Sequence, residues 1–379
     1  MKILICGIEG YIGWPLALRL ISMNHSVYGI DNASRSNMVR VIGGESLTPI
    51  PGRIGRIEQL DTYYINENLH LDPDRWLPSV RAFEPECIVH LAEQPSAPWS
   101  MRGHKSCRFT HMNNVFSTLN LLWYIINYNP SCHLVKLGTM GEYGTPPIDI
   151  PEGFFEIEYK GRQARLPFPK QPNSWYHLTK VHDTNNILFA CRNYSVRATD
   201  IMQGIVFGVR TPEMKEDNLL TRFDYDQYFG TAINRFCVQA ISRKPLTVYG
   251  KGGQTRGFIP LNDSVECLTL AIENPPSRGE YRVFNQFTET YSVRELADRI
   301  AFQATNLGLN TTINHISNPR KESEEHYYNP DCNKLRELGY NPNWDMDSEL
   351  LKLLTDLLPF ASRIREEVIF PTTKWDNRK

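Results

Sequence analysis

Short apolar runs alternate with amphipathic stretches along the first half of the chain. The apolar runs have the length of buried strands and are, in chain order, Lys2–Cys6, Ser26–Ile30, Cys87–Ala92, His133–Leu137 and Thr199–Gln203. Helical spacing of apolar residues occurs in Trp14–Ile21, Asn113–Asn127 and Trp175–Asn193. Because parallel strands need crossover helices, this alternation predicts a doubly wound parallel sheet of the α/β class.

Two segments interrupt this alternation. Residues 32–60 contain four arginines with little periodicity, and we expect them to form a long loop. Residues 145–172 contain six prolines, and we expect a second long loop there. A long loop inside a domain is often a lid over a site, and a plain surface insertion is the alternative.

Glycines mark the junction between the first strand and the first helix. The junction is a GxxGxxG motif, and its residues include Gly7, Gly10, Tyr11, Ile12 and Gly13. Such glycines let the backbone approach a pyrophosphate, whose charge meets the free N–H groups of the helix. The second strand is followed by Asp31, a carboxylate placed to accept both hydroxyls of an adenosine ribose. The pattern predicts a Rossmann sheet that binds a dinucleotide.

Asp31 favours NAD, because its charge would repel the 2′-phosphate of NADP. Arg35 lies close enough to weaken that preference. Asn113 and Asn114 are expected to open a helix beside the nicotinamide, although Asn is also an ordinary helix cap. Further expected cofactor contacts are Asn32, Ser34, Arg35, Glu67, Leu91 and Asn114.

We expect two units from this order of elements. Residues 1–204 are predicted to form the NAD-binding Rossmann domain, and residues 205–379 mainly a smaller α/β substrate-binding domain. Residues 258–285 are expected to return to the Rossmann domain.

Composition narrows the class of partner. The chain has 41 basic and 42 acidic residues, a formal charge of −1, which predicts no nucleic-acid or membrane partner. Eight scattered cysteines without a CxxC predict reduced thiols and no metal site. We expect a cytoplasmic protein, because no apolar run could span a bilayer and the first strand begins at residue 2.

The sequence Tyr176–Lys180 is a YxxxK on a predicted helix, with both side chains on one face. An ammonium group near a phenol lowers its pKa, so Tyr176 can take a proton from a sugar hydroxyl while hydride leaves for nicotinamide. Lys180 can also hold the nicotinamide ribose. Thr139 follows a predicted strand, at the sheet edge where such sites lie. This order predicts a nicotinamide-dependent enzyme that acts on an alcohol.

Six segments resemble the UDP-sulfoquinovose synthase family, extended short-chain dehydrogenases/reductases of the nucleotide-sugar epimerase/dehydratase type. They are Leu137–Pro146, Trp175–Asp183, Asn234–Gln239, Leu246–Gly257, Val283–Glu289 and Glu324–Asn329. The resemblance covers nearly the whole chain, and the sequences TMGEYGTP and TVYGKGGQTRG are its most specific parts.

The resemblance implies UDP-glucose and sulfite as substrates, NAD as a tightly bound cofactor, and a homodimer. Oxidation at C4 acidifies H5, water is lost across C5–C6, sulfite adds to C6, and hydride returns to C4. By convention this carbon–sulfur bond-forming enzyme is classed with hydrolases. On this analogy Tyr176 is the C4 base, Lys180 its electrostatic partner, and Thr139 holds the C4 oxygen.

The acid and base for the C5–C6 elimination are less well defined. Related dehydratases carry an acidic pair where this chain has Met140 and Gly141. Glu142 and His177 are the nearby candidates. The alternatives are a loop carboxylate bonded to the backbone for Glu142 and a packing role for His177.

The UDP moiety needs cations and polar groups. Arg256 and Arg320 resemble the diphosphate arginines of sugar epimerases, although either could be a solvated surface charge. Further candidate substrate contacts are Thr139, Gln203, Arg235, Tyr249 and Gln254.

The chain departs from the family pattern at two places. Pro95 stands where an arginine is expected, which removes one cation for phosphate or sulfite. Asn66–Asn68 replaces a Gly-Asp-Ile turn, and Glu67 could still accept from the adenine amino group.

Two other functions use the same residues. A UDP-glucose 4-epimerase or 4,6-dehydratase would share the C4 oxidation. A non-catalytic NAD-binding scaffold would need the glycine motif but not the Tyr176–Lys180 pair.

Overall fold

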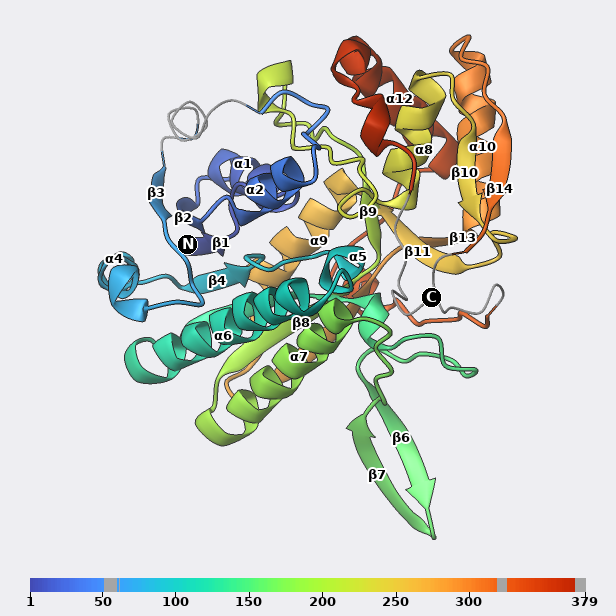
Figure 1. Ribbon diagram of the computed structural model, residues 1–379. Helices are drawn as coiled ribbons and strands as arrows, with labels where there is room; N and C mark the ends of the chain where they lie inside the picture. Colours follow the sequence, from blue (N-terminus) through green and yellow to red (C-terminus); the bar gives the residue numbers. More distant parts are fainter. Residues whose placement is uncertain (51–59, 61, 319–325, 372–379) are drawn as a thin grey trace.

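The computed structural model describes residues 1–50, 60, 62–318 and 326–371, and its centre is a seven-stranded sheet (Figure 1). The strand order is β12-β8-β5-β4-β1-β2-β3, and every neighbouring pair is parallel. In chain order these strands are β1 (Lys2–Cys6), β2 (Ser26–Asp31), β3 (Tyr63–Asn66), β4 (Cys87–His90), β5 (His133–Thr139), β8 (Arg197–Gln203) and β12 (Tyr281–Gln286). The predicted doubly wound α/β sheet is confirmed.

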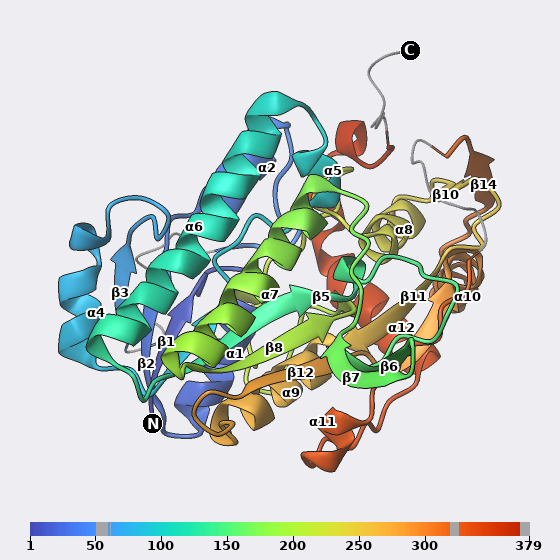
Figure 2. The same ribbon diagram turned by 90° about the horizontal axis from the view of Figure 1, so that it is seen from below.

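Helices cover both faces of this sheet (Figure 2). Helices α1 (Gly13–Ser22) and α9 (Leu261–Glu273) pack together on one face, and α6 (His104–Tyr128) and α7 (Trp175–Tyr194) pack together on the other. A short helix, α4 (Leu77–Phe83), extends the second layer. Alternate side chains of β1 enter the two resulting cores, Ile3 and Ile5 on one side and Leu4 and Cys6 on the other.

The second half of the chain forms a smaller unit beside the carboxyl ends of the strands. Its core lies between α8 (Ala232–Ile241), α10 (Val293–Asn306) and α12 (Met346–Leu357). Two small sheets join it, β10 (Leu246–Tyr249) with β14 (Ile313–Ile316), and β13 (Glu289–Ser292) with β11 (Thr255–Pro260) and β9 (Ile205–Phe207). Strand β12 and helix α9 of this half belong to the large sheet and its helical layer.

Short elements connect the larger ones. They are α2 (Ser34–Val41), α5 (Ala97–Ser100), α11 (Lys334–Glu337) and the 3-10 helices η1 (Pro73–Arg75), η2 (Met140–Glu142), η3 (Asp217–Leu219), η4 (Leu358–Arg363) and η5 (Glu366–Val368).

Three local expectations were wrong. Residues 32–60 are not one long loop, because α2 begins at Ser34; Arg53 and Arg56 of this segment lie outside the described residues. Helix α6 begins at His104, not at Asn113, because residues 104–112 are helical without apolar periodicity. Asn113 and Asn114 therefore lie inside the helix and do not cap it.

Residues 145–172 are also not a structureless loop. They contain an antiparallel hairpin of β6 (Phe154–Tyr159) and β7 (Arg162–Pro167), which projects from the molecule (Figure 1). Lys160 and Gly161 have positive φ angles of 52° and 74°, as a tight hairpin turn requires. No residue of this segment lines the large cavity described below, which favours the surface insertion over the lid.

Candidate active site

A cavity of about 510 Å³ lies where the strand ends of the large sheet face the smaller unit. It brings together most of the residues expected from the sequence: Gly7, Gly10, Tyr11, Ile12, Gly13, Asp31, Asn32, Ser34, Arg35, Glu67, Leu91, Thr139, Tyr176, His177, Lys180, Gln203, Arg235, Tyr249, Gln254 and Arg256. Glu142 and Asn114 do not line it, and Arg320 lies outside the described residues.

The glycine motif forms a tight turn between β1 and α1. Gly7 has a φ angle of +89°, and its N–H donates to the carbonyl oxygen of Ile30 at 2.7 Å. A Cβ atom on Gly13 would lie 2.1 Å from the Gly7 carbonyl oxygen, so no larger residue fits there. Gly10 and Gly13 line the cavity at the start of α1, where a pyrophosphate can approach the backbone.

Asp31 is fixed at the end of β2 by two backbone donors. The Glu9 N–H donates to Oδ2 at 3.0 Å, and the Ala33 N–H donates to Oδ1 at 2.8 Å. Glu67, on the same side of the cavity, forms an ion pair with Arg75 at 3.0 Å. The residues at this end match what an adenosine ribose requires, a fixed carboxylate beside a glycine turn.

Tyr176 and Lys180 project from the first turns of α7. Ser174 caps this helix by accepting from the His177 N–H. The Lys180 ammonium donates to the Leu137 carbonyl oxygen at 2.5 Å and lies 5.9 Å from the centre of the Tyr176 ring. Burial raises the pKa of the Tyr176 phenol, and the nearby carboxylate of Glu93 raises it further. The phenol therefore depends on nearby positive charge to lose its proton.

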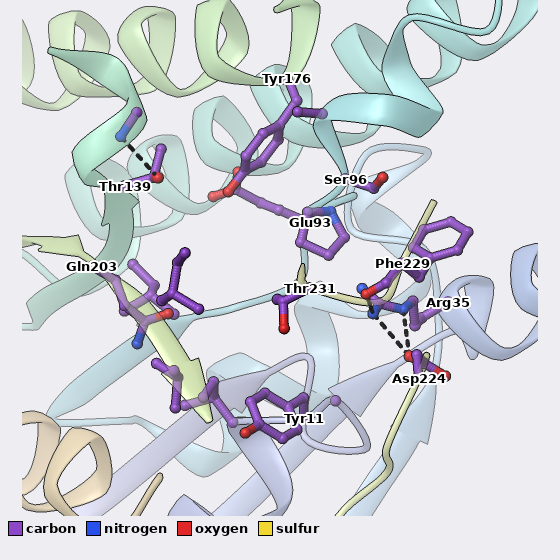
Figure 3. A pocket seen from close by; sticks show the side chains of 18 of the residues that line it. Tyr11, Arg35, Glu93, Ser96, Thr139, Tyr176, Gln203, Asp224, Phe229 and Thr231 are labelled. Carbon is purple, nitrogen blue, oxygen red and sulfur yellow. Dashed lines mark hydrogen bonds and ion pairs between the residues drawn. The ribbon is translucent and has the colours of Figure 1, made fainter. Parts of the chain in front are cut away.

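Thr139 stands at the end of β5 and begins the short helix η2. Its hydroxyl oxygen accepts from the Gly141 N–H at 3.2 Å, and its own N–H donates to Glu142 Oε1 at 3.4 Å. Figure 3 shows Thr139 and Tyr176 on opposite sides of the same part of the cavity. A sugar hydroxyl between them would meet both an alcohol and a phenol.

Glu142 lies behind the cavity wall and is fully buried. Its carboxylate forms ion pairs with Lys136 at 3.1 Å and Lys170 at 2.5 Å, and accepts from the Thr184 hydroxyl at 2.9 Å. Burial alone would raise the pKa of this carboxyl, but the two lysines outweigh it and lower the pKa to about 2. The contact of Glu142 with the site residues runs through the Thr139 N–H, which donates to Oε1 at 3.4 Å.

His177 does line the cavity, beside Tyr176. Its Nδ1 lies 2.7 Å from Asn173 Oδ1 and 3.0 Å from the Ser174 hydroxyl. The ring packs on Gly141 so closely that a Cβ atom there would lie 2.3 Å from Nε2. Asn173 and Ser174 thus hold the His177 ring at its Nδ1 side.

Glu93 is a cavity residue that the sequence analysis missed. It follows β4, its side chain is only 3% exposed, and Oε2 lies 2.6 Å from the Lys180 ammonium. Burial raises the pKa of this carboxyl against the opposing effect of Lys180. Figure 3 shows its carboxylate pointing toward Tyr176. Its position just after a buried strand was the available signal, since sites in parallel sheets gather at such ends.

The opposite end of the cavity holds buried polar groups that lack partners in the described residues. They are Nε of Arg235 and Nε2 of Gln254. Arg235 lies 5.5 Å from the ring centre of Tyr249, and Arg256 donates to the Thr255 carbonyl oxygen at 2.7 Å. Gln203 donates to Ser264 and Gln286, both at 2.9 Å. Buried donors without partners indicate a polar ligand at this end.

Asn114 does not line the cavity, but its side chain forms hydrogen bonds behind the cavity wall. Its amide oxygen accepts from the Gln94 N–H at 2.8 Å, and its amide nitrogen donates to the Thr179 hydroxyl at 3.0 Å. Pro95, the departure from the family pattern, lines the cavity next to this contact.

The described part of the chain contains no cluster of three or more potential metal ligands. No described helix is long and apolar enough to cross a membrane.

The chain is similar to proteins with known functions. The model of the NAD dependent epimerase/dehydratase family matches residues 3–285. The chloroplastic UDP-sulfoquinovose synthase of Spinacia oleracea is 47% identical, across 99% of this chain and 79% of its own length. The UDP-sulfoquinovose synthase of Sulfolobus acidocaldarius is 45% identical, across 99% of this chain and 98% of its own length.

Among solved structures, the UDP-glucose 4-epimerase of Thermotoga maritima has a TM-score of 0.71. It is 20% identical, and the match covers 94% of this chain and 98% of the epimerase. At this identity the likeness shows a shared fold.

Proposed function

Because the chain belongs to the NAD dependent epimerase/dehydratase family, and within it to the UDP-sulfoquinovose synthases, we propose that it makes UDP-sulfoquinovose from UDP-glucose and sulfite. One observation carries the proposal: the cavity combines Thr139, Tyr176 and Lys180 in a chain that is similar to two such synthases over nearly its whole length.

NAD is the cofactor, and the residues present fit it. The glycines of the turn carry no side chains that could block a pyrophosphate, and the turn has no room for larger residues. The fixed carboxylate of Asp31 can accept hydrogen bonds from both hydroxyl groups of a ribose. When bound, NAD would supply the acceptor for the hydride of C4 and the source of its return at the end of the cycle. Lys180 would hold the nicotinamide ribose, for which its ammonium would leave Glu93.

Tyr176, Thr139 and Lys180 carry the chemistry at C4. Tyr176 takes the proton of the C4 hydroxyl as the C4–H bond breaks, and Thr139 donates a hydrogen bond to the C4 oxygen. Lys180 stabilises the phenolate by its charge. The resulting C4 ketone acidifies H5, so that C5 can lose a proton and C6 its hydroxyl as water. The sulfur of sulfite then bonds to C6, and C5 regains a proton.

The elimination needs a base near C5. We assign it to His177, because this ring lines the cavity beside Tyr176. Glu142 acts indirectly, through its contact with the Thr139 N–H, since two lysines hold it as a buried carboxylate.

The nucleotide end of the cavity would bind the UDP moiety. Arg235 and Gln254 have buried donors without described partners, and Arg256 lies beside them. A guanidinium group on a diphosphate forms charge-assisted hydrogen bonds, which are about twice as strong as neutral ones.

We further propose that two copies of the chain pair through α6 and α7. Aromatic side chains gather on the outer surface of these helices, where Trp123 and Phe189 both pack against Tyr194. Trp123 is 49% exposed and Phe189 is 59% exposed. Large exposed aromatic groups on one surface are typical of an interface.

We place the protein in the cytoplasm, since all eight cysteines are unpaired.

The test is mass spectrometry of the purified protein incubated with UDP-glucose, NAD and sulfite, beside a sample without sulfite. We expect a sulfonated UDP-hexose only when sulfite is present. Formation of UDP-galactose or of a 4-keto-6-deoxy sugar would support the C4 oxidation and refute sulfonation. Bound NAD without any turnover would point to a scaffold.

A further inference from the structure

Arg35 occupies the position from which a Rossmann protein can recognise NADP. It lies in the first turn of α2, four residues after Asp31, and both residues line the cavity. In Rossmann proteins an arginine near the end of this strand accommodates the 2′-phosphate of NADP, whereas an acid binds the 2′-hydroxyl of NAD. The chain therefore carries the residues for both preferences, four positions apart.

The guanidinium group of Arg35 is already engaged by the smaller unit. Its Nε donates to Asp224 Oδ2 at 2.9 Å, and its Nη2 lies 2.8 Å from the same oxygen (Figure 3). Nη2 also donates to the Phe229 carbonyl oxygen at 3.1 Å, and the group stacks 4.5 Å from the centre of the Phe229 ring. Donors on one edge of Arg35 are therefore used.

Asp224 is buried and hydrogen-bonded in a position that keeps it next to Arg35. Its side chain is 2% exposed and also accepts from Arg222, whose Nε and Nη2 approach its two oxygens at 2.9 and 3.0 Å. Arg222 is anchored in turn to the Ser36 hydroxyl at 3.0 Å. The two guanidinium groups keep the pKa of Asp224 below its usual value, although burial alone would raise it, so this residue is a carboxylate at neutral pH.

We propose that Asp224 is a second determinant of the preference for NAD over NADP, because its carboxylate pairs with Arg35 and occupies donors that could otherwise bind a 2′-phosphate. Asp31 repels that phosphate, and Asp224 competes with it for the guanidinium group of Arg35. The inference rests on NAD as the cofactor and not on the sulfite chemistry.

The test is competition between NAD and NADP for the purified protein, read by native mass spectrometry after incubation with equal concentrations of both. We expect D224N to raise the ratio of bound NADP to bound NAD about tenfold, the effect of one charge-assisted contact to a phosphate. The double variant R35A/D224N should return to the ratio of the unaltered protein. An unchanged ratio in D224N, or a gain that persists in R35A/D224N, would overturn the proposal.

The matched control is D226N. Asp226 lies two residues from Asp224 and accepts from the Tyr228 and Phe229 N–H groups, which an asparagine oxygen can also do. D226N makes the same Asp-to-Asn change without removing a hydrogen bond of Arg35, so we expect no change in the NADP ratio. A gain in D226N equal to that in D224N would attribute the effect to net charge and overturn the role of Asp224.

A second comparison leaves Asp224 intact, in case D224N does not fold. In D31S the repulsion by Asp31 is removed while Arg35 stays paired. The proposal predicts that D31S and D31S/R35A bind NADP in the same ratio to NAD. A lower NADP ratio in D31S/R35A would mean that Arg35 reaches the phosphate despite Asp224. Because dinucleotide occupancy is measured, failure here is independent of whether UDP-sulfoquinovose forms.

Discussion

At the scale of single residues, the proposed chemistry depends on where positive and negative groups meet around one phenol. Tyr176 is buried, faces the carboxylate of Glu93 and lies close to the ammonium of Lys180. Burial and the carboxylate favour the protonated phenol, and the ammonium favours the phenolate. Substitutions of Tyr176 and Glu93 should separate the effect of the phenol on turnover from the effect of the carboxylate on its pKa.

Replacing Tyr176 with Phe should sharply reduce turnover and leave NAD bound, since the phenol is the proposed base for C4 and the ring is kept. We expect a loss of about 10²- to 10⁴-fold, the usual contribution of a general base. Product formation by mass spectrometry and the absorbance of bound cofactor measure the two properties. Tyr159→Phe, on the exposed hairpin, is the matched control, and full activity in Tyr176→Phe would refute the assignment.

Glu93→Gln should shift the pH dependence of the C4 oxidation step. The carboxylate raises the pKa of Tyr176, so its removal lowers that pKa and lets the phenolate form at lower pH. We expect the midpoint of the rise in rate with pH to move down by about one unit. NADH absorbance after mixing with UDP-glucose measures this step.

Glu67→Gln is the control for this shift, because Glu67 lines the cavity at its adenosine end and pairs with Arg75. Its pH profile should match that of the unaltered protein. A midpoint that stays fixed or moves upward in Glu93→Gln would contradict the role given to this carboxylate.

Glu142→Gln should destabilise the protein in a pH-dependent way. Breaking a buried ion pair costs about 3–5 kcal/mol. The folded-state pKa of about 2 lies below the usual 4.5, so the stabilisation is present above 4.5 and is lost as the pH falls toward 2. The difference in free energy of unfolding between the unaltered protein and Glu142→Gln should therefore become smaller as the pH falls. A difference that stays constant from pH 7 to about pH 3 would contradict this account.

At the scale of secondary structure, the residues of the site are set by the ends of strands and the first turns of helices. Thr139 ends β5, Glu93 follows β4, and Tyr176 and Lys180 begin α7. The apolar patterns identified these elements from the sequence, because buried strands and amphipathic helices have distinct periods. The start of α6 escaped the pattern, since its first turns are mostly polar.

The β6–β7 hairpin is separate from this arrangement and should be dispensable for catalysis. Phe155 and Leu166 pair directly across the two strands, so an Asn-Gly turn can replace residues 156–165 without moving the base of the hairpin. We expect a folded protein with turnover within about twofold of the original, as exposed loop tips tolerate deletion. Turnover with free sulfite and circular dichroism test this. A folded variant without turnover would show that the hairpin takes part in catalysis.

At the scale of the whole molecule, the outer surface of α6 and α7 is where we expect a second copy to bind. Trp123→Glu places a charge among the exposed aromatic groups of this surface and should convert the dimer to a monomer. Light scattering after size-exclusion chromatography measures the mass. Phe302→Glu, on α10 and 63% exposed, is the control and should leave the dimer intact. Equal behaviour of both variants would contradict this interface.

The sequence by itself determined five of the seven strands of the sheet, its glycine turn and the order of Thr139, Tyr176 and Lys180, because each rests on a local pattern of residues close together in the chain. The two long loops predicted from the sequence were wrong. These segments contain a hairpin and a short helix, whose weak periodicity leaves little signal in the sequence.

Only the tertiary structure decided which charges meet. Arg35 and Asp224 are separated by 189 residues, and their pairing depends on how the smaller unit sits against the sheet. The same holds for Glu93 beside Lys180 and for Glu142, which the fold buries between two lysines. Whether a carboxylate accepts a proton, binds a cation or holds another residue in position depends on its burial and its partners. Both are set by contacts between distant segments.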